Sequence, residues 1–202
     1  YKTFKIFSNG IMSPASILNI DKNLNITIRN NFKSFIRRRA LGVVFVIAPW
    51  NYPYLTAVNS IIPALAAGNS IILKHSAQTP LCAEQLYQSA QKTLPKDVFN
   101  YLHLNHQDWL KVVSDKRINF VSFTCSVKAG YDVQRATHTK FIDMALELGG
   151  KDPAYARYDC DLDKTVENLV DGSFFNSGQS CCGIERIYVY EKIYDKFLEQ
   201  FI

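Results

Sequence analysis

Three patterns that would indicate other classes of protein are missing from this sequence. No Cys-x-x-Cys pair occurs among the five cysteines, which argues against a structural zinc site. No apolar run reaches the roughly 18 residues that a membrane-spanning helix needs, and no cationic segment followed by an apolar one opens the chain. We therefore expect no metal and no membrane partner, and a location in the reducing cytoplasm, where free thiols persist.

Acidic residues are scarce in the first forty positions, which hold eight Lys or Arg against one acid, Asp21. The whole chain carries +5, so this segment carries +7 and the remainder −2. Arg37-Arg38-Arg39 is its densest point and could form a nucleic-acid patch. A solvated approach to the first buried strand is the favoured interpretation, and we expect no nucleic-acid partner.

The composition is that of an ordinary globular protein, with 48% hydrophobic and 20% charged residues. From Leu41 onward, strand and helix patterns alternate, which predicts an α/β fold with a parallel, Rossmann-like sheet. Strands are expected over 41–48, 70–74, 98–102, 118–123 and 141–148, and helices from Pro53 to Gly68, from Thr79, over 107–114 and over 127–137.

The pattern changes at Gly149-Gly150, where we expect a domain boundary. A loop, a helix over 162–175, a strand over 186–190 and a helix from Lys192 should follow. Residues 1–149 would then form an incomplete cofactor-binding domain, and residues 150–202 the beginning of an α/β catalytic domain. Two local features are also predicted: Pro63 should bend its helix, and Thr79 should cap the next helix, with Pro80 in its first position.

Four short stretches could carry chemistry. In the first, Phe174–Gly183, two glycines bracket Cys181 and Cys182, so the backbone can bend and expose a thiol. A thiolate is the reactive form of cysteine. The alternative is that both cysteines pack as small apolar side chains.

The second stretch is Leu146–Lys151, in which Glu147 ends an apolar strand that we expect to be buried. A carboxylate there is costly unless it is paired or used, so it is either a general base or half of an ion pair with Lys151. The third is Ala48–Asn51, at the carboxyl end of the first buried strand. Asn51 could donate a hydrogen bond to an oxyanion, or could simply form a turn beside a packed Trp50.

The fourth stretch, Phe123–Gly130, passes from a strand into a helix, where free backbone N–H groups can hold a phosphate. Many such turns bind nothing. No Gly-x-Gly-x-x-Gly occurs anywhere in the chain, so the ordinary dinucleotide fingerprint gives no support.

Taken together and in this order, these stretches resemble the aldehyde dehydrogenase superfamily over roughly residues 36–202. The matching segments are LGVVFVIAPWNYP (41–53), IIPALAAGNSIILKHSAQTP (61–80), VSFTCSVKAG (121–130), LELGGKDPA (146–154) and FFNSGQSCCG (174–183). The combination of LELGG with GQ-x-C is highly specific.

The resemblance implies an oxidoreductase (EC 1.2.1.-) that oxidises a small aldehyde to a carboxylic acid through a cysteine thiohemiacetal and thioester. Cys181 would be the nucleophile, Glu147 the general base and Asn51 the oxyanion-binding amide, with Cys182 structural. The cofactor would be NAD, contacted by Ile47, Ala48, Pro49, Trp50, Lys74, Ser126, Leu148 and Gly149. A complete subunit would form a homo-oligomer.

The chain departs from the family pattern at positions that bear on the cofactor. Lys74 is followed by His75-Ser76-Ala77 where Pro-Ser-Glu is usual. The replaced Glu normally accepts hydrogen bonds from the ribose hydroxyls, so NADP is also possible. Cys125 stands where many members have the Gly of FTGS, and its side chain would either crowd the backbone beside the pyrophosphate or be absorbed by a small shift.

Family subunits are more than twice as long as this chain, which leaves two other functions open. One is a truncated, inactive remnant that binds at most a nucleotide or a partner. The other is a CoA-acylating relative, against which Glu147 argues because only the hydrolytic branch needs the base. The particular aldehyde is not readable from the sequence.

Overall fold

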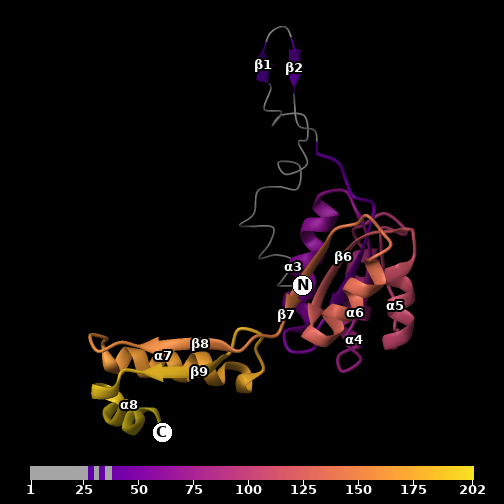
Figure 1. Ribbon diagram of the computed structural model, residues 1–202. Helices are drawn as coiled ribbons and strands as arrows, with labels where there is room; N and C mark the ends of the chain where they lie inside the picture. The colour runs from indigo at the N-terminus through magenta and orange to yellow at the C-terminus, as the bar shows by residue number, and fades with distance from the viewer. Residues whose placement is uncertain (1–26, 30–31, 35–37) are drawn as a thin grey trace. The chain divides into compact units, whose positions relative to one another are not determined.

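The computed structural model describes residues 27–29, 32–34 and 38–202 (Figure 1). Most of the basic segment 1–40 lies outside these residues, although Arg38 and Arg39 are described and are exposed, as expected. Strands β1 (Thr27–Arg29) and β2 (Phe32–Ser34) pair in an antiparallel manner. The chain divides into two units. The first runs to Thr124 and resumes over Tyr131–Leu146, and the second comprises Cys125–Gly130 and Glu147–Ile202.

A five-stranded sheet organises the first unit, in the order β5-β4-β3-β6-β7. Its strands are β3 (Val43–Ala48), β4 (Ser70–His75), β5 (Phe99–Tyr101), β6 (Ile118–Cys125) and β7 (Met144–Leu148). The central strand β3 pairs in parallel with β4 on one side and β6 on the other. The predicted α/β class with a parallel sheet is confirmed.

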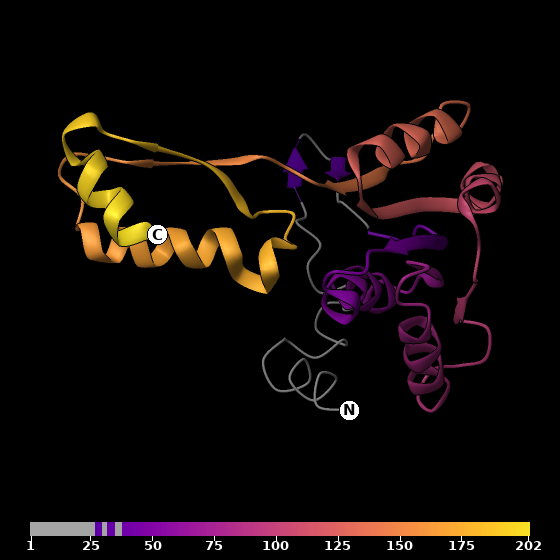
Figure 2. The same cartoon turned by 90° about the horizontal axis from the view of Figure 1, so that it is seen from below.

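Four helices alternate with these strands: α3 (Pro53–Ala66), α4 (Leu81–Gln91), α5 (His106–Ser114) and α6 (Val127–Thr137). Helices α3 and α4 cover one face of the sheet, and α5 and α6 lie on the other (Figure 2). Strand β3 is buried on both faces because its neighbours and helices enclose it. Val44 and Val46 pack in the α3/α4 core, whereas Phe45 and Ile47 occupy alternate positions and therefore face the other way.

Two asparagine side chains secure the segment that leads into β3. The Asn69 Oδ1 accepts the N–H groups of Leu41 (2.6 Å) and Gly42 (3.0 Å), and its Nδ2 donates to the Ala64 carbonyl at 2.9 Å. The Asn119 Oδ1 accepts the N–H of Val43 at 2.8 Å. These amides satisfy backbone donors that the strand ladder does not reach.

Helix α3 runs without interruption through Pro63 to Ala66, and Gly68 follows with φ +84. The N–H groups of Gly68 and Asn69 bond back to the carbonyls of Leu65 and Ala64, which closes the helix where the sequence predicted.

The expectation that Thr79 caps α4 is wrong. The helix begins at Leu81, and its N-cap residue, Pro80, makes no side-chain cap bond. The Thr79 hydroxyl lies 3.0 Å from the Nδ1 of His75. The hydroxyl is therefore engaged by the preceding strand and does not turn toward the helix.

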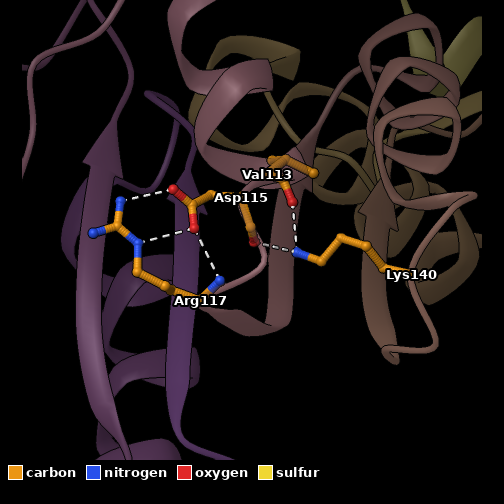
Figure 3. Close-up of polar contacts among 4 residues, drawn as sticks. All are labelled: Val113, Asp115, Arg117 and Lys140. Atoms are coloured by element: carbon orange, nitrogen blue, oxygen red, sulfur yellow. Dashed lines mark hydrogen bonds and ion pairs between the residues drawn. The ribbon is translucent and has the colours of Figure 1, made fainter.

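The turn from α5 into β6 is held by charged side chains (Figure 3). The Lys140 Nζ donates to the carbonyls of Val113 (2.9 Å) and Asp115 (2.6 Å), at the carboxyl end of α5. The Asp115 carboxylate accepts from the Arg117 side chain at 2.7 and 3.0 Å and from its backbone N–H at 2.9 Å. A cation at a helix carboxyl end satisfies carbonyls that have no partner inside the helix.

Figure 1 shows the second unit as a pair of parallel strands with a helix alongside. Its elements are β8 (Asp152–Ala156), α7 (Leu162–Phe174), a 3-10 turn η1 (Phe175–Gly178), β9 (Ile184–Val189), η2 (Glu191–Ile193) and α8 (Tyr194–Phe201). Ala156, Val166, Leu169 and Phe197 form its core. A Cβ at Gly172 would lie 2.6 Å from the Ile184 Cδ1, so the glycine allows α7 to pack closely against β9.

The sequence predicted a loop where β8 lies, and this is wrong. Pro153 cannot donate to a ladder and reads as a strand breaker. The strand accommodates it because the β8–β9 register shifts between Asp152 and Pro153.

Candidate active site

The loop that carries Cys181 follows a turn of unusual backbone geometry. Asn176 (φ 52) and Ser177 (φ 58) are left-handed without being glycines, and Gly178 continues at φ 72. Such conformations cost about 1–3 kcal/mol each and cluster at functional sites. The turn ends α7 abruptly and directs the chain into residues 179–183 as an open loop.

Both Cys181 and Cys182 are exposed, so the alternative in which they pack as buried apolar side chains is wrong. They differ in their local contacts. The Cys182 Sγ lies 3.3 Å from the Ser180 hydroxyl, which engages it inside the loop. The Gly183 N–H donates to the Ser180 carbonyl at 3.2 Å and closes the turn around both cysteines.

Within the same unit, Gly150 brings the LELGG segment against the cysteine loop. A Cβ on Gly150 would lie 3.3 Å from the Cys181 carbonyl oxygen and 2.5 Å from the Asp152 Oδ1. A glycine therefore suits this close approach. The segment containing Glu147 and the loop containing Cys181 meet at this point in the fold.

Glu147 lies on β7, whose residues alternate between half-buried and exposed positions. The expectation that this strand is buried is wrong, because β7 is an edge strand of the sheet. The Glu147 side chain is exposed. The Lys151 Nζ pairs with the Glu185 Oε2 at 2.6 Å, so this lysine forms a different ion pair from the predicted one with Glu147.

In the first unit, the predicted Ala48–Asn51 stretch lies where β3 ends and the chain turns toward α3. Pro49 is buried, Asn51 is half-buried, and Trp50 is 40% exposed, so Trp50 is not the packed ring that the alternative required. The next strand in sequence, β4, pairs on one side of β3, whereas β6 pairs on the other. The carboxyl ends of β3 and β6 therefore flank the point where the strand order reverses, which is where open α/β sheets bind ligands.

Lys74 pairs in register with Ile47, one position before His75 pairs with Ala48. Alternation along β4 places Lys74 on the face opposite Ile71 and Leu73, whereas His75 shares their buried face. Burial is the main cause that lowers the pKa of His75 from 6.5, and it is opposed by the hydrogen bond to the Pro53 carbonyl. The burial of His75 was not predicted, although its place on the apolar face of an alternating strand is a signal of burial.

Ser126 lies at the start of α6, and its hydroxyl accepts the Ala129 N–H at 3.3 Å. A Cβ on Gly130 would lie 2.9 Å from the Leu148 Cδ2, so Leu148 packs closely on the first turn of this helix. Leu148 therefore packs on the helix whose first turn Ser126 precedes. The N–H groups of a first helical turn have no acceptor inside the helix and are suited to a phosphate.

The predicted site residues fall into two groups, one in each unit. The first unit holds Ile47, Ala48, Pro49, Trp50, Asn51 and Lys74. The second holds Ser126, Glu147, Leu148, Gly149 and Cys181. In the first unit, Ile47 pairs in register with Lys74, and in the second, Leu148 packs on α6 while Gly150 approaches the Cys181 carbonyl.

Two further features bear on what the described residues can bind. Across them, no cluster of three or more His, Cys, Asp or Glu side chains is arranged to hold a metal ion. None of the helices in the described ranges combines the length and the apolar character that crossing a membrane requires.

The sequence profile of the aldehyde dehydrogenase family matches residues 13–202. The chain belongs to this family. It is 34% identical over 175 residues to the D-glyceraldehyde dehydrogenase (NADP(+)) of Picrophilus torridus, a match that covers 86% of this chain and 36% of that protein.

Solved structures of family members superpose well on the fold. A 3,6-anhydro-L-galactose dehydrogenase in complex with NADP gives a TM-score of 0.83 at 35% identity, covering 88% of this chain and 38% of that one. PnpE in complex with nicotinamide adenine dinucleotide gives 0.84 at 30% identity, covering 89% and 37%. The chain therefore spans less than two fifths of the length of each of these three proteins, which bind NAD or NADP.

Proposed function

We propose that this chain carries the nucleophile, the general base and much of the cofactor site of an NAD(P)-dependent aldehyde dehydrogenase of the hydrolytic branch. The observation that carries the proposal is the packing of Gly150 against the carbonyl of Cys181. This contact joins the LELGG strand to an exposed cysteine loop, as a base and a nucleophile that act in turn require.

In the proposed mechanism, the Cys181 thiolate adds to the aldehyde carbonyl and forms a thiohemiacetal. The Asn51 amide and the Cys181 backbone N–H donate hydrogen bonds to the developing oxyanion. The chemistry that a bound nicotinamide supplies is hydride acceptance, which leaves the acyl group on Cys181 as a thioester. Glu147 then takes a proton from water, and the hydroxide releases the carboxylic acid and restores the thiolate.

Two places at the carboxyl edge of the sheet support the fit of a dinucleotide: the residues that follow β3 and the residues that follow β6. After β3, residues Ile47, Ala48, Pro49 and Trp50 would line its path, with Lys74 beside them on β4. After β6, the α6 N-terminus with Ser126 would receive a phosphate. Leu148 packs against α6 where Gly130 has no Cβ. Together with Gly149, it would lie toward the nicotinamide.

The organisation of a complete subunit follows from the same proposal. Residues 1–149 would belong to the cofactor-binding domain and residues 150–202 would begin the catalytic domain. A complete subunit would take a small aldehyde and assemble with copies of itself. All five cysteines are free, which supports a reducing cytoplasm as its location.

The reactivity of the cysteines tests this assignment on the 202-residue chain. We expect iodoacetamide to modify Cys181 at least about tenfold faster than Cys182, as an activated thiol would. The rate at each cysteine is measured by peptide mass spectrometry over time. Cys181→Ser should abolish the fast phase, and Cys182→Ser, the matched neighbour, should retain it.

Labelling in urea supplies the reference, because Cys181 and Cys182 should react at the same rate once the loop is unfolded. Equal rates at the two cysteines in the folded chain would contradict the assignment of Cys181. A parent chain that also fails to bind NADH or NADPH in a fluorescence titration would favour a non-enzymatic remnant.

A further inference from the structure

Among the described residues, His75 is the one buried side chain that can ionise. It is 2% exposed, and the other buried polar side chains in this part of the chain are Asn69 and Thr137. It closes β4 at the carboxyl edge of the sheet. The proposed mechanism makes no use of it, yet a buried polar ring is costly unless its nitrogens are satisfied.

Both ring nitrogens have partners. The Nε2 lies 2.9 Å from the Pro53 carbonyl oxygen, and the Nδ1 lies 3.0 Å from the Thr79 Oγ1. A carbonyl only accepts, so the Nε2 carries the proton and donates to it. In the neutral ring the Nδ1 then accepts from the Thr79 hydroxyl, which assigns the tautomer from its partners.

His75 holds both ends of the turn that contains Asn51. Its backbone pairs with Ala48, the last residue of β3 before the turn, and its imidazole bonds to Pro53, the first residue of α3 after it. The N-cap of α3, Tyr52, makes no side-chain cap bond. The His75 imidazole on the neighbouring strand therefore forms a hydrogen bond with the first residue of this helix.

The other ring nitrogen fastens a second turn. Thr79 ends the segment that runs from β4 toward α4 and includes Ala77, the position next to the proposed ribose site. One ring thus connects the turn that carries the oxyanion amide with the turn that faces the ribose. Both lie in the first unit of the chain.

We propose that His75 is a positioning residue whose neutral imidazole sets the Pro49–Tyr52 turn and the Ser76–Thr79 turn relative to each other. The role of these turns in aldehyde oxidation rests on the proposed function, whereas the connection itself does not. The titratable groups that act on the ring are Lys74, its neighbour in sequence on the opposite face of β4, and His103, which follows β5. Burial and both of these groups disfavour a charged ring, whereas the backbone hydrogen bonds to Pro53 and Ser76 favour it.

The experiment uses the 202-residue chain with Trp109→Phe, which leaves Trp50 as the only tryptophan. Trp50 lies inside the fastened turn, so acrylamide quenching of its fluorescence reports on that turn. Loss of one hydrogen bond within a folded protein commonly shifts a local equilibrium about fivefold. We therefore expect His75→Ala to raise the quenching constant about twofold or more while the far-UV circular dichroism is unchanged.

Two variants separate the bonds. His75→Gln keeps a donor that can reach the Pro53 carbonyl and should restore parental quenching of Trp50. Thr79→Val removes only the hydrogen bond between the Thr79 hydroxyl and the His75 Nδ1. The quenching constant of Trp50 should then equal that of the parent. In a folded His75→Ala chain, parental quenching of Trp50 would overturn the proposal.

If His75→Ala does not fold, nitrogen chemical shifts of His75 in the Trp109→Phe chain decide the matter. An Nε2–H tautomer with an accepting Nδ1 supports the proposal, and an Nδ1–H tautomer or a charged ring at neutral pH overturns it. NADH titration is run in parallel. A parent chain that fails to bind NADH counts against the proposed function, and the Trp50 and tautomer results still decide the role of His75.

Discussion

At the scale of single residues, the side chains of the turn between β4 and α4 should decide whether the chain binds NAD or NADP. Ala77 and Gln78 are exposed, and the Gln78 N–H donates to the Ser76 hydroxyl at 3.3 Å, which fixes the turn locally. The family resemblance places a Glu where Ala77 stands. Its carboxylate would hydrogen-bond the ribose hydroxyls and repel a 2′-phosphate. Without that charge, the chain should accept NADP beside NAD.

Ala77→Glu should therefore weaken NADPH binding relative to NADH. Two like charges at about 6 Å and an effective dielectric of about 20 repel by roughly 1–3 kcal/mol, which is about ten- to hundredfold in Kd. Fluorescence titration of both reduced cofactors measures the ratio. Gln78→Glu adds the same charge one residue along and should change the ratio less. A parent chain that already rejects NADPH as strongly as the Ala77→Glu variant would refute the prediction.

Single residues also mark the limit of what the sequence revealed. The glycines around Cys181 indicated that a bent loop could expose its thiol, but they left packing of both cysteines as an alternative, which the structure excludes. The left-handed backbone at Asn176 and Ser177 could not, because neither residue requires that conformation. Glu147 was predicted to end a buried strand because its neighbours are apolar. The apolar pattern does not reveal that the strand lies at the edge of the sheet.

At the scale of elements, the connection between α5 and β6 depends on one lysine. Burial lowers the pKa of Lys140, and the hydrogen-bonded Arg117 side chain holds the pKa of Asp115 well below its usual range. The Lys140 ammonium satisfies two carbonyls at the end of α5 and aligns favourably with the helix dipole. It connects this helix end to the segment that precedes β7.

We expect Lys140→Met to lower the free energy of unfolding by about 1–3 kcal/mol, because two carbonyls lose a charged donor. Urea unfolding followed by circular dichroism gives the value. Lys116→Met, at an exposed lysine of the same turn, should change it by less than about 0.5 kcal/mol. Equal effects of the two substitutions would mean that the Lys140 bonds contribute nothing specific.

Most elements of the first unit could be predicted from the sequence, because apolar runs and glycines mark them clearly. The range of α6 was predicted without error, and those of β5 and α5 to within a residue. The prediction failed at β8, where Pro153 conceals a strand that a register shift accommodates. It failed again at Thr79, whose hydroxyl bonds back to the ring of His75 and not to the helix that follows.

At the scale of the whole molecule, stability should depend on pH in two separate ranges. His75 has a pKa lowered from 6.5, chiefly by burial, so the unfolded chain binds its proton first as pH falls. Stability from the neutral ring is present above pH 6.5 and is lost as pH falls through the lowered pKa. Asp108 and Asp115, bonded to Lys111 and Arg117, also have lowered pKa values and lose their contribution only below 3.8.

The free energy of unfolding of the parent chain should therefore fall between pH 6.5 and the acid range, with a slope of at most about 1.4 kcal/mol per pH unit. In His75→Gln, the free energy of unfolding should change less between pH 6.5 and the acid range. Its decrease below pH 3.8 should remain. Urea unfolding at several pH values measures both. His138→Gln, at an exposed histidine, is the control and should follow the parent. An identical slope in His75→Gln would assign the acid sensitivity to other groups.

How distant segments meet is the part that the sequence left open. The carboxyl ends of β3 and β6 flank the switch point, yet nothing in either strand names the other as its neighbour. The segment that follows the proposed base approaches the loop of the proposed nucleophile at Gly150, which reads in the sequence only as a turn residue. Such contacts follow from the closing of the whole fold and not from local propensity.

The closure of β3 by Asn119 has a consequence for how the chain emerges from the ribosome. Val43 and Asn119 are 76 residues apart, and β6, the second neighbour of β3, is made only after Asp115. At about 5–20 residues per second, the most apolar strand waits roughly 4–15 s with one edge open. Nascent chains stalled before residue 118 should therefore aggregate or hold chaperones, and release should follow once β6 has left the exit tunnel.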